Sequence, residues 1–218
     1  MPKEPRIARR SRAAKLLARL RRAYPDAKCS LDHSNPLQLL VATILSAQCT
    51  DDRVNIVTKD LFRKYRSADD FAKAPPGVLE QDIRSTGFYK NKARSLRACC
   101  ADIVAIHGGR VPDTMDALTA LAGVGRKTAN VILATAFGKA EGIAVDTHVT
   151  RLSQRLGLTR HTEPEKIERD LMALVPPRNW DSLSLLLIFH GRRRCMARNP
   201  DCEHCEVAAL CPKIGVKG

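Results

Sequence analysis

One stretch of the chain, residues 118–146, combines three groups that could do chemistry on a polyanion. The Gly-Val-Gly turn at residues 123–125 can point peptide N–H groups at an anion, because glycine adopts backbone angles that other residues avoid. Lys127 follows as a candidate amine nucleophile, and Asp146 as a carboxylate that could assist it. We therefore expect a phosphate-binding turn, an amine and a carboxylate to act together.

The residues beside this turn favour anion binding over a plain connection between helices. Arg126 and Lys127 stand at the expected N-terminus of the second helix, which is its electropositive end. Apolar residues recur at helical spacing on both sides of the turn, at Leu118, Leu121, Ala129 and Ile132. The pattern predicts a helix-hairpin-helix at about residues 114–137. The G-x-x-x-x-G-K-[ST] spacing of a P-loop is absent here, so nucleotide hydrolysis is not expected.

A second group that could do chemistry is a C-x6-C-x2-C-x5-C run near the C-terminus: Cys195, Cys202, Cys205 and Cys211. Four thiolates repel one another without a cation, and their sulfurs suit zinc or an iron–sulfur cluster equally well. One close pair flanked by two single cysteines favours [4Fe-4S], although zinc stays open on spacing alone. The other cysteines lie at helical-face positions and are interpreted as small buried residues: Cys29, Cys49, Cys99 and Cys100.

Composition indicates a nucleic-acid partner. The 218 residues carry 37 Lys plus Arg against 23 Asp plus Glu, a formal charge of +14, and 44% are hydrophobic. The basic leader from Lys3 to Arg22 has a simpler interpretation as a solvated segment. No apolar run approaches the ~18 residues of a membrane span, and no secretory signal is apparent. We expect a soluble cytoplasmic protein, nucleoid-associated if bacterial, with reduced cysteines and no membrane partner.

The elements that must position these groups are helices. Apolar residues recur every three or four positions along the chain, and no segment alternates as a strand would. Helix starts are predicted at Asn35-Pro36, after Asp113, and at a capping box formed by Thr162 and Glu165. A basic N-terminal helix with Leu16, Leu17 and Leu20 on one side should pack on the C-terminal part. The chain is predicted to be all-α, with a boundary near residues 138–142.

Several motifs resemble the endonuclease III family of helix-hairpin-helix DNA glycosylases. In the family's order, over roughly residues 20–212, they are Ser46–Asp51, Gly87–Ala93, Leu121–Asn130, Val145–His148, His190–Arg192 and the four-cysteine loop. The resemblance implies a six-helix barrel lobe of residues 29–139. It also implies an iron–sulfur lobe of residues 1–28 and 140–218, with a [4Fe-4S] cluster held in the loop 195–211.

The same resemblance implies roles for individual residues. Lys127 would be the nucleophile, and Asp146 would assist it. Gln48 would act as a wedge that fills the gap left by an extruded base, and Phe88 would be a second wedge. Duplex DNA would lie across the cleft between the lobes of a monomer. Phe88 is aromatic where an aliphatic wedge is common. Including Arg198 in the cysteine loop, the expected DNA-binding residues are Gln48, Phe88, Gly123, Val124, Gly125, Arg126 and Arg198.

The implied activity is base excision repair of oxidised pyrimidines such as thymine glycol, followed by cleavage of the strand 3′ of the abasic site. A helix N-terminus and the neighbouring Arg126 should favour the uncharged amine of Lys127 that this chemistry needs. Two alternatives remain at this point. One is a monofunctional mismatch glycosylase, which uses its carboxylate to activate water and usually lacks the hairpin lysine. The other is a DNA-binding module without enzymatic activity.

Overall fold

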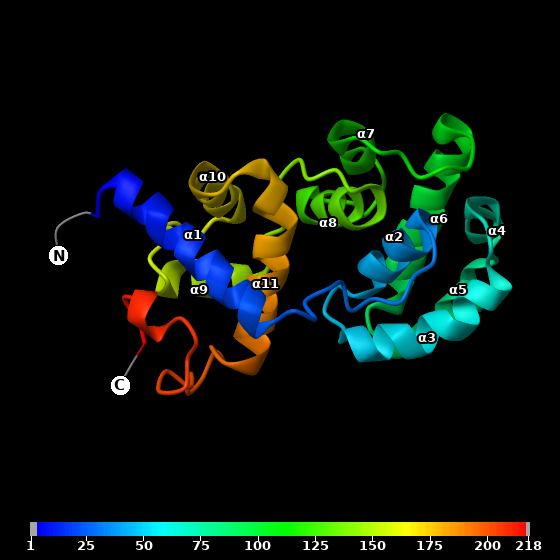
Figure 1. The fold of residues 1–218 in the computed structure, drawn as a ribbon. Coiled ribbons are helices and arrows are strands. Elements are labelled where there is room, and N and C mark those ends of the chain that lie inside the picture. The colour runs from blue at the N-terminus through cyan, green and yellow to red at the C-terminus, as the bar shows by residue number, and fades with distance from the viewer. Residues whose placement is uncertain (1–3, 217–218) are drawn as a thin grey trace. The chain divides into compact units, whose positions relative to one another are not determined.

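A computed structural model describes residues 4–216 of the chain (Figure 1). Lys3, the first cation of the basic leader, lies outside the described residues. Within them every regular element is helical, as predicted. The elements are α1 (Arg6–Ala23), α2 (Pro36–Leu45), α3 (Asp51–Lys64), α4 (Ala68–Lys73), α5 (Pro76–Asp82), η1 (Arg84–Thr86), α6 (Tyr89–His107), α7 (Met115–Thr119), α8 (Arg126–Phe137), α9 (Thr147–Arg155), α10 (Pro164–Leu174), η2 (Pro177–Asn179), α11 (Trp180–Arg193) and η3 (Ala208–Leu210).

The chain divides into two compact units, each with its own apolar core. We call Cys29–Lys139 the central unit, and Met1–Lys28 together with Ala140–Gly218 the terminal unit. The division falls at the loop after α8, where the end of the second hairpin helix is predicted. Each core is formed by leucine, isoleucine and valine side chains from several helices, so each unit has its own source of hydrophobic stabilisation.

In the central unit, α2 is the most completely buried helix. Six of its ten residues are buried, so it is apolar on nearly all sides, as expected for a helix surrounded by others. It begins at the predicted Asn35-Pro36, where the Asn35 side chain accepts a hydrogen bond from the backbone N–H of Gln38 at 3.0 Å. Around α2 pack α3, α6 and α8, and α7 packs against α8 (Figure 1).

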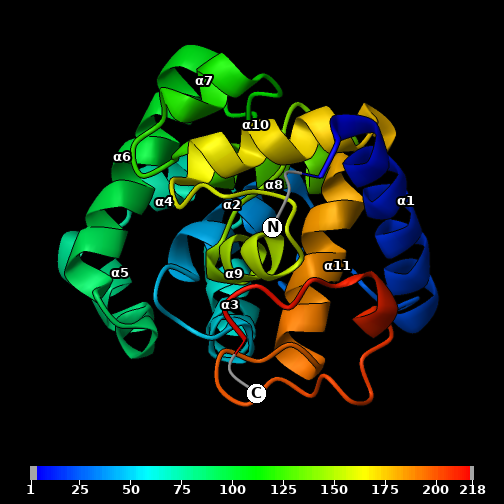
Figure 2. The same cartoon turned by 90° about the vertical axis from the view of Figure 1, so that its left-hand side faces the viewer.

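In the terminal unit, the first helix of the chain packs against helices from its C-terminal half. Leu16, Leu17 and Leu20 are buried on one side of α1, which contacts α10 and α11, so this prediction is confirmed. Figure 2 shows α9 beside α10 and α11. At Gly191 of α11 a Cβ atom would lie 2.8 Å from His148 Nδ1 and 3.0 Å from an Arg151 nitrogen. Only glycine permits this close approach between α11 and α9.

Two predicted helix starts are displaced. Thr114 rather than Asp113 caps α7, by accepting a hydrogen bond from the N–H of Ala117, and Asp113 instead pairs with Lys139. The predicted capping box of Thr162 and Glu165 is wrong, because α10 starts one residue later. Its N-cap is Glu163, which makes no side-chain cap, and Pro164 occupies the first turn.

Helices long and apolar enough to cross a membrane are absent from residues 4–216.

Candidate functional site

The predicted hairpin is formed by α7, the turn and α8, and its shape depends on Gly123. Gly123 has φ +77°, in the left-handed region that side chains disfavour. A Cβ atom there would also lie 3.0 Å from Ser95 Cβ on α6. The expectation that Gly125 also needs an unusual conformation is wrong, because its φ of −88° is open to any residue. Gly123 therefore sets the turn, and Gly125 serves as the N-cap of α8.

The start of α8 offers backbone donors to an anion. The first N–H groups of any helix have no partner inside it, and Gly125 has no side chain that could cap them. Val124 does not belong to this donor set. Its side chain is 5% exposed, and its N–H donates to the carbonyl of Leu121 at 3.1 Å. Arg126 and Lys127, in the first turn of α8, are both exposed.

Asp146 is the N-cap of α9. Its carboxylate accepts a hydrogen bond from the N–H of Val149 at 2.7 Å, which fixes the side chain at the electropositive end of this helix. Asp146 is half-buried, whereas Val149 behind it is fully buried in the core of the terminal unit. The carboxylate is thus held rigidly and keeps a second oxygen that this bond does not use.

Gln48 and Phe88 share an uncommon backbone conformation. Their φ angles are +54° and +47°, in the left-handed region that only a few per cent of non-glycine residues occupy. Among the described residues only two others with side chains do so, Asn199 and Lys213. Gln48 lies in the turn between α2 and α3, Phe88 immediately before α6, and both side chains are exposed. Strained backbone that presents an exposed side chain is typical of functional positions.

The four cysteines of the C-terminal loop line one small pocket, together with Arg155 of α9 and His190 of α11. Within the described chain, no three of these sulfurs lie within 4.8 Å of one another. A single tetrahedral zinc ion, with Zn–S bonds of about 2.3 Å, would hold its sulfurs about 3.8 Å apart. Cysteines that each bind a different iron of an iron–sulfur cluster need no such close approach.

Donors directed at the sulfurs support a metal-binding role for the loop. A guanidinium nitrogen of Arg155 donates to Cys195 Sγ at 3.3 Å, and the backbone N–H of Lys213 donates to Cys211 Sγ at 3.3 Å. Hydrogen bonds of this kind stabilise thiolate ligands and tune the bound centre. Burial raises the pKa of the Cys205 and Cys211 thiols, so a cation is needed to hold them as thiolates.

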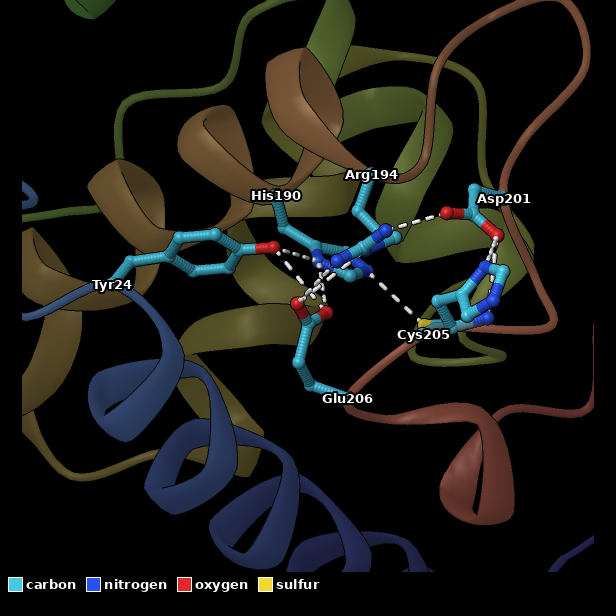
Figure 3. A network of polar contacts seen from close by, with 7 residues as sticks. Tyr24, His190, Arg194, Asp201, Cys205 and Glu206 are labelled. Carbon is cyan, nitrogen blue, oxygen red and sulfur yellow. Dashed lines mark hydrogen bonds and ion pairs between the residues drawn. The ribbon is translucent and has the colours of Figure 1, made fainter.

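A polar network ties the N-terminal segment to the cysteine loop (Figure 3). The Tyr24 hydroxyl lies 2.8 Å from Nδ1 of His190, and Nε2 of His190 lies 3.6 Å from Cys205 Sγ. Arg194 binds Glu206 at 3.2 Å and also pairs with Asp201. Burial lowers the pKa of His190 to about 4, which keeps its ring neutral. His190 is therefore a neutral, hydrogen-bonded member of this network.

Arg198, the cation of the cysteine loop that the sequence analysis selected, is exposed. Its neighbours Arg193 and Arg194 are engaged internally, since Arg193 pairs with Asp26 at 2.6 Å. Cys99 and Cys100 are fully buried on α6, as predicted. The prediction is wrong for Cys29 and Cys49, which lie outside the helices and are only half-buried against the central core. Burial raises the pKa of the Cys99 thiol to about 12, so it has little nucleophilic character.

The predicted site residues fall into two groups. Gln48, Phe88 and the hairpin with Lys127 belong to the central unit, whereas Asp146, Arg198 and the four cysteines belong to the terminal unit. Sequence reasoning missed the residues that support them: Arg155 and Tyr24 beside the cysteine loop, and Lys92 on α6. Local patterns do not mark Arg155 or Tyr24, because their partners lie far away along the chain. Lys92 falls within the Gly87–Ala93 motif, but nothing there shows that it will bind Leu45, 47 residues away.

Two family profiles match the chain. Residues 41–177 match the HhH-GPD superfamily base excision DNA repair protein, and residues 195–211 match the iron–sulfur binding domain of endonuclease III. The second match covers the run from Cys195 to Cys211 that lines the pocket.

Individual proteins agree with these profiles. The endonuclease III of Synechocystis sp. is 53% identical over 205 residues, which is 94% of this chain and 94% of that protein. A solved non-covalent endonuclease III–DNA complex is similar with a TM-score of 0.89 and 46% identity, over 94% of this chain and 95% of the other. A trapped endonuclease III–DNA covalent intermediate is similar with a TM-score of 0.89 and 45% identity, over 94% and 96%.

Proposed function

The chain belongs to the endonuclease III family of the HhH-GPD superfamily of base excision DNA repair proteins, and from this premise we propose how its own residues act. It is a DNA glycosylase with AP lyase activity that removes oxidised pyrimidines from duplex DNA. The observation that supports this most directly is the position of Lys127. Its exposed amine stands in the first turn of α8, beside backbone donors that no side chain caps. A phosphate bound by those donors brings a sugar to the amine.

The first step is extrusion of the damaged nucleotide. Its glycosidic carbon cannot be reached inside a duplex, so the nucleotide must swing out, at an unstacking cost of a few kcal/mol. Gln48 and Phe88 enter the gap from their strained turns. A saturated, non-planar pyrimidine such as thymine glycol stacks poorly, which lowers this cost and favours damaged over normal bases. Selection of the substrate thus begins before any bond is broken.

The second step is covalent. The neutral amine of Lys127 attacks C1′ of the everted nucleotide, the glycosidic bond breaks, and the base leaves with its bonding electron pair and takes up a proton. The sugar ring then opens to a Schiff base between Lys127 and C1′. This acidifies the C2′ proton, whose loss expels the 3′ phosphate by β-elimination and cuts the strand. An activated water could release the base but could not carry out the elimination.

Asp146 acts through its charge. Held as the N-cap of α9, the carboxylate stabilises positive charge that develops on the sugar and assists proton transfer from Lys127. Capping and catalysis are compatible, because the bond to Val149 occupies one carboxylate oxygen and holds the group rigid.

The four cysteines hold a [4Fe-4S] cluster. When bound, the cluster links four points of a loop that has little core of its own, and so supplies folding energy to it. Arg155 fastens this loop to α9, and Tyr24 at the end of α1 donates a hydrogen bond to Glu206 of the loop at 3.4 Å. The role is structural, and it presents the exposed Arg198 to the DNA backbone. Because the substrate is chromosomal DNA, we expect the protein in the cytoplasm, at the nucleoid of a bacterium.

Incubation with two duplexes tests this function: one with a thymine glycol and one with an abasic site. We expect base release and strand cleavage on the first and cleavage on the second. Base release without cleavage on the first, with an intact second duplex, would indicate a monofunctional glycosylase. Binding without either reaction would indicate a module that only recognises DNA. An absorption spectrum of the same preparation should show the broad visible band of an iron–sulfur cluster, which zinc lacks.

A further inference from the structure

One buried cation of the central unit has no place in the mechanism above. Lys92, in the first turns of α6, is 6% exposed, and lysine is almost never buried without partners. Its ammonium donates to the backbone carbonyl of Leu45 at 2.8 Å and to that of Thr86 at 2.8 Å. Burial lowers the pKa of Lys92, which is the cost of placing this cation in the core.

The two carbonyls that Lys92 binds both end a helix. Leu45 is the last residue of α2, and Thr86 is the last residue of η1. Carbonyls at helix ends lack intrahelical partners and form the electronegative pole, so an ammonium is well suited to both. Its tetrahedral donors can serve two carbonyls on separate segments, which an apolar side chain of the same length could not do.

Each of these carbonyls stands just before a proposed wedge residue. Gln48 is three residues after Leu45, and Phe88 is two residues after Thr86. The backbone of Lys92 holds the second turn as well, because its N–H donates to the carbonyl of Phe88 at 3.0 Å. Lys92 thus holds the turn in which Gln48 adopts the left-handed conformation and also the turn in which Phe88 does so. Such conformations persist only where the surrounding structure imposes them.

We propose that Lys92 is a positioning residue for nucleotide extrusion, which joins the turns of Gln48 and Phe88 into one preorganised wedge. The inference rests on the proposed function, in which these two side chains enter the DNA stack. A wedge whose turns were free to relax would have to be ordered at each extrusion. Fixing them beforehand leaves more of the binding energy for opening the duplex.

The test compares duplex with single-stranded substrate, because only the duplex requires a wedge. For Lys92→Met, which keeps most of the length of the side chain and removes its donors, we expect base release from a thymine glycol duplex to slow at least tenfold under single-turnover conditions. Cleavage of an abasic site in single-stranded DNA should stay within about twofold of wild type. Lys92→Arg, which retains donors, should recover part of the duplex rate.

Lys64→Met is the matched control. It makes the same substitution in the same unit at a half-exposed lysine, which pairs with Asp82 at 2.7 Å. We expect both of its rates to stay near wild type. A merely structural role of Lys92 would predict equal losses on both substrates, in proportion to the folded fraction measured by circular dichroism, and that result would overturn the proposal. If Lys92→Met does not fold, Lys92→Gln takes its place. Its shorter side chain cannot hold both carbonyls as lysine does, so the same selective loss on the duplex is expected.

A fluorescent base opposite the lesion supplies a second measurement. Its unstacking when the protein binds should be slower in Lys92→Met than in wild type, and unchanged unstacking would contradict the inference. Gln48→Ala and Phe88→Ala separate this inference from its premise. If neither slows the duplex reaction, the wedge assignment itself fails. If both slow it and Lys92→Met does not, only the role of Lys92 fails. In a Gln48→Ala, Phe88→Ala background, Lys92→Met should have little further effect.

Discussion

The side chains proposed to meet DNA in the central unit and those around the cysteine loop in the terminal unit are held in different ways. In the central unit, Lys127, Gln48 and Phe88 are exposed, and each is held in place through its backbone at a helix start or a strained turn. In the terminal unit, Arg193 and Arg194 are engaged by carboxylates, and Arg155 is directed at a cysteine sulfur. The side chains proposed to act on DNA are thus accessible to it, while their backbone is held rigidly. The charged groups on and beside the cysteine loop are instead paired with other residues of the protein.

Loss of the exposed amine should have the largest effect on activity. We expect Lys127→Ala to lower strand cleavage by roughly 10³-fold or more and to abolish the covalent adduct that borohydride traps on abasic DNA. The control is Lys139→Ala, just beyond the other end of α8, where the amine pairs with Asp113. It should retain the adduct. An adduct of normal yield with Lys127→Ala would assign the nucleophile to another residue.

The terminal unit should respond to loss of a cluster ligand through its stability. Cys202→Ala leaves three thiolates for four irons, so we expect loss of the visible absorption band and of bound iron, with unfolding at a lower temperature. Cys99→Ala is the matched control. It removes a fully buried sulfur from the central core, should cost roughly 1 kcal/mol, and should leave the absorption intact. Full iron content in Cys202→Ala would exclude Cys202 as a ligand.

Asp146 has two proposed roles, as the cap of a helix and as a charge that assists the reaction. Two substitutions separate these roles. Asparagine caps helices as well as aspartate does, so Asp146→Asn should keep nearly wild-type stability. It loses the charge that assists the reaction, and we expect its base-release rate to fall about 10²-fold. Asp146→Ala should lose activity similarly and also about 1 kcal/mol of stability through the missing cap. Full activity in Asp146→Asn would reduce this residue to a cap.

The smallest expected effect concerns the hairpin turn. Gly123→Ala requires a left-handed alanine whose Cβ lies 3.0 Å from Ser95 Cβ, so we expect a loss of about 2 kcal/mol. Gly125→Ala has ordinary backbone angles and open space around the new methyl group, and should cost at most about 1 kcal/mol, because alanine is a poorer N-cap. Equal denaturation midpoints for the two variants would show that the turn tolerates a side chain at Gly123.

Local signals predicted much of this molecule, and the errors are informative. The helical periodicity and the start at Asn35-Pro36 are confirmed. The capping box at Thr162 fails, because the neighbouring Pro164 is itself well suited to the first turn of a helix and α10 begins there. Likewise, the sequence could not show that only one glycine of the Gly-Val-Gly turn needs a positive φ. That depends on how the turn packs against Ser95 of α6.

The types and spacing of residues determined the helical class, the hairpin, the candidate amine and the four candidate sulfur ligands, because these depend on neighbours along the chain. Only the tertiary structure decided what depends on distant segments. It directed Arg155 at Cys195, joined Tyr24 to His190, and placed the ammonium of Lys92 between the ends of α2 and η1. The physical reason is that a buried charge must find its partners in space, and no sequence pattern records which folded carbonyl or sulfur will lie within reach.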